Sequence, residues 1–84
     1  MDFWAPWCGP CLMQTPVLEE VASQVAGHAT IAKVNVDEEP ELANRFGIQS
    51  IPTLILFKDG KKVSQFAGFQ SGPSLIAAIE KVAT

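Results

Sequence analysis

Hydrophobic positions in the first third of the chain recur at the spacing of an amphipathic helix. A short apolar start at 1–5 is typical of the end of a strand, and apolar residues three and four positions apart follow between about Gly9 and Ala26. These residues are Val17, Leu18, Val21, Ala22 and Val25. Gly27, a typical helix stop signal, comes directly after them. The pattern therefore predicts a strand end followed by one helix.

The rest of the chain predicts alternating strands and helices. TIAKVNV at 30–36 is typical of a strand, and TLILFK at 53–58 is a continuous apolar run expected of a strand buried on both faces. Between them, DEEPELANRF predicts a short helix capped by Asp37, with Pro40 in its first turn. Asp59-Gly60 indicates a tight hairpin turn into KKVSQFAG at 61–68. A last helix begins near Pro73, with Leu75, Ile76, Ile79 and Val82 on its apolar face. The element order predicts an α/β domain.

Composition narrows the class of protein. The chain has 84 residues, which is typical of a single domain over 1–84. A hydrophobic content of 48% argues against disorder. The net charge is −3 without a basic stripe, which excludes a nucleic-acid partner, and no apolar run approaches the roughly 20 residues of a membrane span. With no signal-like start and too few cysteines for a disulfide scaffold, we expect a reducing, cytoplasmic compartment.

The two cysteines form a C-x-x-C motif, Cys8 and Cys11, which has three physical interpretations. In a redox site, Cys8 lies at a helix start that stabilises a thiolate, and Cys11 lies one turn further on. Alternatively, two chains bring their cysteine pairs together around a zinc ion or a [2Fe–2S] cluster, since the one histidine, His28, is at the far end of the helix. A structural disulfide is the third interpretation, although so small a loop contributes only about 2 kcal/mol.

The motifs together resemble the thioredoxin family: WCGPC preceded by DFWAP, then IPT, and the late glycine of FAGF. The resemblance implies a three-layer α/β sandwich whose mixed sheet ends in a β-hairpin. It also implies an enzyme that reduces disulfides in client proteins through a Cys8–Cys11 disulfide, with Cys8 as nucleophile and Cys11 as resolving thiol. Such a protein binds no cofactor, and a thioredoxin reductase recharges it with electrons from NADPH. Gly9-Pro10 matches the reducing members of the family.

The resemblance also assigns residues to client binding. Trp7 matches the surface tryptophan beside the nucleophile, whereas Trp4 is expected to pack inside the protein. Ile51-Pro52 matches a cis-proline that faces the cysteines and leaves the preceding backbone free to pair with an extended client. Gly68 matches the glycine that lets a client backbone approach.

Asp2 and Lys33 match a buried acid that takes the proton of the resolving cysteine and the lysine paired with it. Here only Met1 precedes Asp2, so we expect its charged ammonium to reach water or to pair with Asp2. Either outcome lowers the pKa of the Asp2 carboxyl relative to the family, and a hydrated Asp2 has reduced importance. Leu12 also departs from the family, where a basic residue is common.

The family carries a strand, a helix and half of a further strand before the position of Asp2. The expected fold is therefore truncated at the N-terminus, with residues 30–36 at an open sheet edge and one apolar sheet face uncovered. We expect a homodimer through that edge or face, or else a monomer less stable than longer relatives. A non-catalytic interaction module with the same fold is a further functional alternative.

Overall fold

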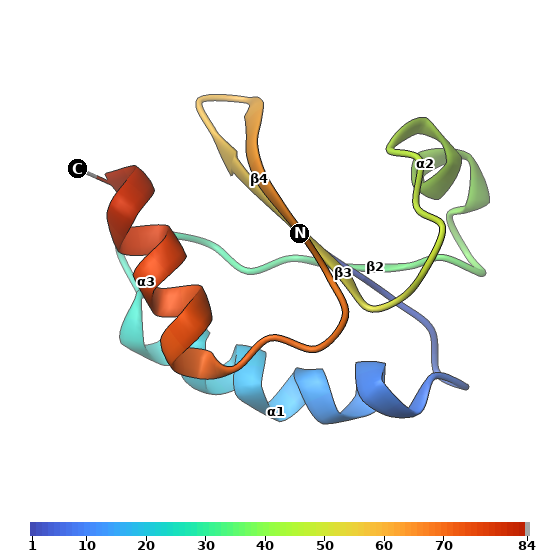
Figure 1. The fold of residues 1–84 in the computed structure, drawn as a ribbon, viewed down its shortest axis with the longest axis horizontal. Coiled ribbons are helices and arrows are strands. Elements are labelled where there is room, and N and C mark those ends of the chain that lie inside the picture. The colour runs from blue at the N-terminus through green and yellow to red at the C-terminus, as the bar shows by residue number, and fades with distance from the viewer. Residues whose placement is uncertain (84) are drawn as a thin grey trace.

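A computed structural model describes residues 1–83 and confirms the predicted order of elements (Figure 1). The elements are β1 (Asp2–Trp4), α1 (Gly9–Gln24), β2 (Lys33–Asn35), α2 (Pro40–Arg45), β3 (Thr53–Lys58), β4 (Lys61–Ala67) and α3 (Gly72–Ala83). Within residues 1–83, no helix is both long enough and apolar enough to cross a bilayer.

The strands form one mixed sheet in the order β2-β1-β3-β4. β1 pairs in parallel with β2, where Asp2 lies opposite Lys33, and antiparallel with β3. β3 and β4 form the predicted hairpin, and its turn residues Asp59 and Gly60 both have positive φ, at 54° and 79°. Two successive positive φ values are the signature of the type I′ turn that Asp-Gly favours.

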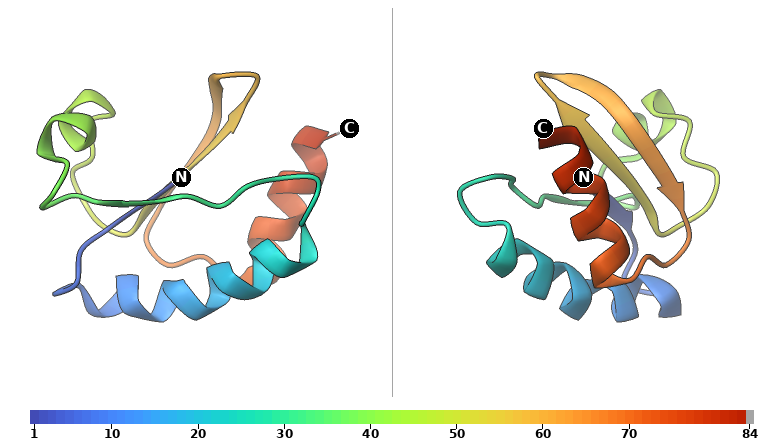
Figure 2. Two further views of the ribbon diagram at one scale, coloured as in Figure 1. Left: turned by 180° about the vertical axis from the view of Figure 1, so that it is seen from behind. Right: turned by 60° about the vertical axis from the view of Figure 1, so that its left-hand side comes forward.

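Successive residues of β3 pack into two different hydrophobic cores, one on each face of the sheet. Leu54 belongs to a core formed with α1 and α3, whereas Ile55 belongs to a core formed with α2. The first core contains Leu18, Val21, Val25, Leu54 and Leu75, and the second contains Phe3, Ala43 and Ile55. Since side chains alternate along a strand, α1 and α3 cover one face and α2 lies on the other. Figure 2 shows this arrangement, with α1 and α3 together and α2 apart from them.

An aromatic cluster fills the core on the α2 side. The ring centroid of Phe46 lies 5.8 Å from that of Phe3 and 5.6 Å from that of Phe57, in tilted and edge-on arrangements. Such geometries are the favoured ones for aromatic pairs. Phe3 is completely buried, so this cluster fixes β1 from the side opposite to α1.

Three sequence-based expectations about the strands and helices differ from the structure. The second strand covers only Lys33–Asn35 rather than 30–36, and β3 becomes half-buried and then exposed toward Lys58. Asp37 does not cap α2, because the N-cap residue is Glu39, which makes no side-chain cap. The Asp37 carboxylate instead accepts a hydrogen bond from Trp7, a partner 30 residues away.

Two leucines of α1 provide a matched test of the core. Leu18 is 3% exposed within the α1–α3 core, whereas Leu12 on the same helix is 51% exposed. We expect Leu18→Ala to lower the free energy of unfolding by about 2–5 kcal/mol, since it removes buried methyl groups and leaves a cavity. Leu12→Ala should change it by less than about 0.5 kcal/mol. Urea unfolding of both variants measures the difference, and equal losses would contradict this assignment of the core.

Candidate active site

Cys8 and Cys11 are joined in a disulfide at the start of α1. Cys8 is the N-cap residue, with an extended backbone, and its amide N–H donates to the carbonyl oxygen of Ala5 at 3.1 Å. Ala5 is itself completely buried just after β1, so the strand fixes where the helix begins. The predicted position of the motif at a helix start is therefore confirmed.

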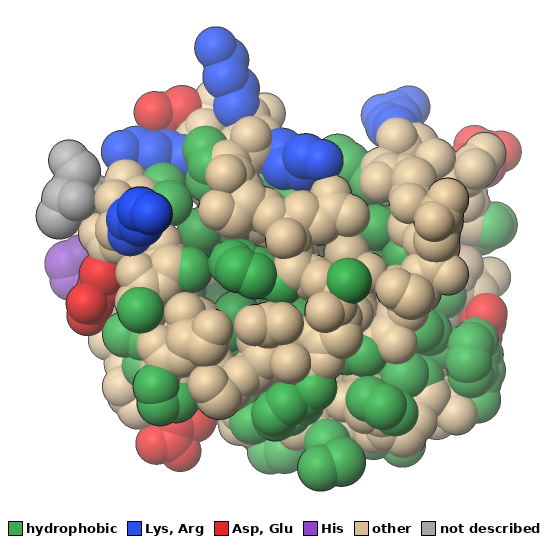
Figure 3. All heavy atoms as spheres, in the orientation of Figure 1, with side chains coloured by type: hydrophobic (Ala, Val, Ile, Leu, Met, Phe, Trp, Pro, Cys, Tyr) green, Lys and Arg blue, Asp and Glu red, His purple; other side chains and the backbone are tan. Residues whose placement is uncertain are grey.

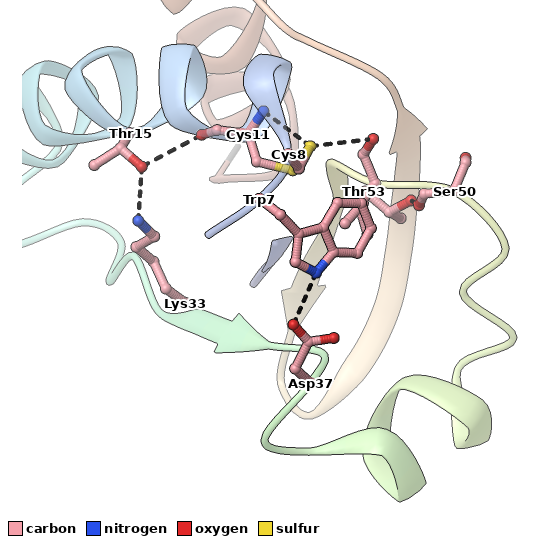
Figure 4. Close-up of a disulfide and its surroundings, with 9 residues drawn as sticks. Trp7, Cys8, Cys11, Thr15, Lys33, Asp37, Ser50 and Thr53 are labelled. Carbon is pink, nitrogen blue, oxygen red and sulfur yellow. Dashed lines mark hydrogen bonds between the residues drawn. A yellow bond between two sulfur atoms is a disulfide. The ribbon is translucent and has the colours of Figure 1, made fainter. Parts of the chain in front are cut away.

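The helix start surrounds the Cys8 sulfur with positive partial charge. The backbone N–H of Cys11 donates to Cys8 Sγ at 3.2 Å (Figure 4). Pro10 lies in the first turn of α1, where a missing N–H costs nothing, and both it and Gly9 are exposed. Unpaired N–H groups and the helix dipole stabilise a thiolate at such a position.

The two cysteines differ in access to solvent. Cys8 retains 6% exposure, whereas Cys11 is completely buried. Cys8 Sγ also lies 3.8 Å from the carbonyl oxygen of Ile51, and the Ile51–Pro52 peptide bond is cis, as the family resemblance implies. The cysteine pair and the proline loop, more than 40 residues apart in the chain, therefore meet at one site.

Gly68 lies beside the proline loop. Its N–H donates to the carbonyl oxygen of Pro52 at 2.8 Å, and its φ of 89° belongs to the left-handed region that favours glycine. A β-carbon placed on Gly68 would meet no atom within 4 Å, so the space next to this backbone is open. The predicted client-binding residues Ile51, Pro52 and Gly68 are thus brought together on one side of Cys8.

Trp7 lies on the surface beside Cys8, and its indole N–H donates to Asp37 Oδ2 at 2.8 Å (Figure 4). The backbone N–H of Asp37 donates to Asn35 Oδ1 at 2.9 Å. This bond holds Asp37 to the end of β2. Sequence analysis assigned Asp37 to a helix cap and missed this partnership. An acidic residue just after a strand that neighbours β1 was the available signal.

Lys33 does not pair directly with Asp2, contrary to the family-based expectation. Its ammonium donates to Thr15 Oγ1 at 2.7 Å and lies 4.1 Å from the ring centroid of Trp4. Thr15 in turn donates to the carbonyl oxygen of Cys11 at 3.4 Å. The lysine is therefore fixed between α1 and β1, and a cation over an aromatic face is a favourable contact.

Asp2 is buried, which decides between the buried and the hydrated carboxyl that the sequence left open. The residue is 1% exposed, and within residues 1–83 neither carboxyl oxygen has a hydrogen-bond partner. It borders a cavity of about 50 Å³ whose other lining residues, among them Leu18 and Val21 of α1, are apolar. Burial raises the pKa of the Asp2 carboxyl above its ordinary value, and the positive charges of Lys33 and the N-terminus oppose this rise.

The N-terminal ammonium does not bond directly to Asp2. It is partly buried and donates to the carbonyl oxygen of Ile55 at 2.7 Å. Burial lowers the pKa of this amine, and the nearby Asp2 charge opposes the shift. Asp2 and the terminus therefore influence each other through space without a direct bond.

Gln14 is a further polar residue near the cysteines that sequence analysis did not single out. Its side chain is completely buried and makes two hydrogen bonds with the backbone of Gln70. The available signal was a polar residue on the helix face that also carries Cys11, Leu18 and Val21, all of them buried.

Exposed apolar side chains adjoin the cysteines along the chain. Exposed large hydrophobic side chains include Trp7, Leu12, Met13 and Phe69. Hydrophobic side chains gather over the α1 edge of the molecule, whereas the Lys and Arg side chains lie away from that edge, over the β3–β4 hairpin, α2 and α3 (Figure 3). The site thus presents a reactive sulfur within an apolar border, which suits contact with another polypeptide.

The metal interpretation finds no support in this geometry. The two cysteines are bonded to each other, and among the described residues no group of three or more histidine, cysteine or acidic side chains could hold a metal ion.

Comparison with known proteins identifies the family. The thioredoxin family model matches residues 1–81. A thioredoxin from Alicyclobacillus acidocaldarius is 56% identical over 82 residues, covering 98% of this chain and 78% of the relative. A thioredoxin from Staphylococcus saprophyticus is 54% identical over 81 residues, covering 96% and 78%. None of these similarities supports the alternative of a metal or cluster shared between two chains.

Solved structures agree with the sequence relatives. A mutant thioredoxin from Halobacterium salinarum superposes with a TM-score of 0.92 at 43% identity, covering 99% of this chain and 72% of that structure. Thioredoxin-2 of the malaria parasite superposes with a TM-score of 0.93 at 32% identity, covering 95% of this chain and 78% of that structure. Thioredoxins use a redox-active disulfide and need no bound cofactor. The chain belongs to the thioredoxin family and is a thiol–disulfide oxidoreductase with its redox disulfide between Cys8 and Cys11.

Proposed function

We propose that this chain reduces disulfides of client proteins, with Cys8 as the attacking thiol and Cys11 as the resolving thiol. The Cys8 thiolate attacks one sulfur of a client disulfide, which forms a Cys8–client mixed disulfide and releases the other client sulfur as a thiolate. The Cys11 thiolate then attacks Cys8 Sγ, closes the Cys8–Cys11 disulfide and releases the second client thiolate. Two electrons pass from the protein to the client.

The observation that carries this assignment is the environment of the Cys8 sulfur. Cys8 Sγ accepts the N–H of Cys11 at the helix start and keeps some exposure, whereas the Cys11 side chain is completely buried. A stabilised and accessible thiolate suits the first attack. A buried thiol one turn away suits an intramolecular second attack, because only Cys8 is within its reach.

The surrounding residues support binding of an extended client segment. Ile51 lies next to Cys8, and Gly68 is joined to the neighbouring Pro52 by a backbone hydrogen bond. Backbone groups at such positions can pair with an added strand. Exposed Trp7, with Gly9 and Pro10, forms the opposite border. Trp7 is held by Asp37, which limits the side-chain entropy lost on binding.

We assign Asp2 the role of accepting the proton of Cys11. A carboxyl whose pKa is raised by burial is better matched to proton transfer near neutral pH than an ordinary one. It faces the same side of the sheet as α1, where it borders a cavity with Leu18 and Val21. Lys33, fixed by Thr15, acts on Asp2 through its charge alone.

The recharging step follows the general system of the family. We propose that a thioredoxin reductase transfers electrons from NADPH to the Cys8–Cys11 disulfide, and that the cytoplasm is where this takes place. The apolar border of the disulfide is as suitable for the reductase as for the clients, since both must reach the same sulfur.

Substitution of each cysteine tests their roles. Cys8→Ser should abolish insulin reduction in the presence of dithiothreitol, because the attacking sulfur is lost. In the Cys11→Ser variant, Cys8 should still attack the client, but no thiol remains to resolve the mixed disulfide. Mixed disulfides should therefore accumulate, and dithiothreitol should release them. Non-reducing gels and mass spectrometry detect the trapped species. Trapping by Cys8→Ser, and not by Cys11→Ser, would reverse the assignment.

The pH dependence of stability tests the burial of Asp2. Because the folded pKa lies above the ordinary 3.8, the native state holds this proton more tightly than the unfolded state. The wild type therefore loses stability as the pH rises from below 3.8 through the folded pKa. The side chain of the Asp2→Asn variant cannot ionise. Its free energy of unfolding in urea, relative to that of the wild type, should therefore be higher at neutral pH than at acidic pH. An equal difference at both pH values would contradict the raised pKa.

The same variant addresses the proton-transfer role. Asp2→Asn should slow insulin reduction more at neutral pH than at high pH, where solvent takes the proton. Asp59→Asn, at the exposed hairpin turn, is the matched control and should leave turnover unchanged. Equal slowing of Asp2→Asn at both pH values would refute the role.

We also propose that the 84-residue chain self-associates through β2 or through the sheet face beside α2. β2 is the outermost strand of the sheet order, and its single charged residue is Lys33. On the α2 side, Val34, Val36 and Phe57 are only half-buried. An open edge is a template for a second chain, and a partly exposed apolar face favours association.

Self-association predicts a melting temperature that rises with protein concentration over about a hundredfold range. An added edge charge, Ala32→Lys, should shift light scattering toward the monomer if β2 is the interface. Ala77→Lys, exposed on α3, is the control and should not. A monomer with a concentration-independent melting temperature would refute the proposal.

A further inference from the structure

The Gln14 side chain joins α1 to the segment between β4 and α3. Its Nε2 donates to the carbonyl oxygen of Gln70 at 2.9 Å, and its Oε1 accepts the N–H of Gln70 at 2.7 Å. The amide thus pairs with both backbone groups of a single residue 56 positions away, as a residue of a neighbouring strand would. The Gln14 side chain is 0% exposed, whereas Gln70 is half-buried, so the amide is held from inside the protein.

The joined segment lies next to the backbone that we propose to bind clients. Residues 68–71 begin with Gly68, whose N–H donates to the carbonyl oxygen of Pro52, and end where α3 begins at Gly72. They also carry Phe69, an exposed apolar side chain directly after Gly68. One end of this loop is therefore anchored to the proline loop and the other to α1, one turn beyond Cys11.

The other side-chain bonds of the loop are long. Gln70 Nε2 donates to the carbonyl oxygen of Gly68 at 3.4 Å, and the Ser74 N–H donates to Ser71 Oγ at 3.3 Å. The two bonds of Gln14 are shorter, and they are the ones that connect the loop to the helix of the cysteines. Burying an amide costs free energy unless both its groups are paired, and an apolar side chain would fill the same space without that cost. The polar choice therefore serves the loop backbone.

We propose that Gln14 is a positioning residue for client binding: it fixes the 68–71 loop against α1, so that the Gly68 backbone and Phe69 are preorganised for an extended client. This inference rests on the proposed reduction of client proteins. A fixed groove lowers the entropy lost when a client docks, whereas the attack of Cys8 on an unbound small disulfide does not use the loop. A substitution of Gln14 should therefore weaken the affinity for protein clients and leave the reactivity of the cysteines unchanged.

The substitution Gln14→Met tests this separation, because it keeps the length of the side chain and removes both hydrogen bonds. We expect the KM for insulin to rise about tenfold, as the loss of two buried hydrogen bonds predicts, while kcat changes by less than about twofold. The rate with a small aromatic disulfide should also stay within about twofold. Gln24→Met is the matched control, since Gln24 is exposed at the end of the same helix.

Amide hydrogen exchange provides the structural readout. In Gln14→Met, the Gln70 amide should lose its protection while amides within β3 and α1 keep theirs. Equal losses in the rates with insulin and with the small disulfide would overturn the inference, and so would an unchanged KM once Gln70 has lost protection. Gln14→Leu is a second apolar replacement, and failure of both variants to fold would assign Gln14 to fold stability instead. Failure of the wild type to reduce insulin would refute the proposed function itself, independently of Gln14.

Discussion

The burial of β1 is the constraint on which the disulfide site depends. This strand has three residues, yet it bonds to β2 on one side and to β3 on the other, and both Asp2 and Phe3 are buried. Phe3 is fixed by the aromatic cluster on the α2 side, and Ala5 then accepts the N–H of Cys8. The position of the Cys8 sulfur is therefore set by packing that lies several residues before it.

The helix that follows is held by two kinds of interaction along its length. Its C-terminal half packs through Leu18, Val21 and Val25 against β3 and α3. Near the cysteines, polar bonds connect it to separate parts of the chain: Thr15 to Lys33, and Gln14 to Gln70. Hydrophobic contact is non-directional, whereas hydrogen bonds fix distance and angle. The directional contacts lie where the geometry of a reaction has to be controlled.

Asp2 shows how the site departs from the most stable arrangement. The Asp2 carboxyl is buried, and within residues 1–83 its oxygens have no hydrogen-bond partner, so the ionised form is disfavoured. Its ionisation at neutral pH lowers the free energy of unfolding. An apolar residue would pack in that cavity more favourably. Lys33 is close enough to lower the pKa of Asp2 through its charge, but its ammonium bonds to Thr15 and not to Asp2. The carboxyl therefore remains able to exchange a proton, which suits the chemistry proposed for the cysteines.

The sequence by itself determined the order of elements, the hairpin at Asp59-Gly60 and the placement of Cys8 at a helix start, because these follow from local periodicity and turn chemistry. It also determined the family, through motifs that need no structure to be read. Tertiary structure alone decided the polar partnerships: Trp7 with Asp37, Lys33 with Thr15, and Gln14 with Gln70, which are 30, 18 and 56 residues apart. It likewise decided that Asp2 is buried and that the N-terminus bonds to Ile55 rather than to Asp2. The physical reason is that a hydrogen bond or a desolvated charge depends on atoms brought together by the fold, and a local pattern contains no information about them.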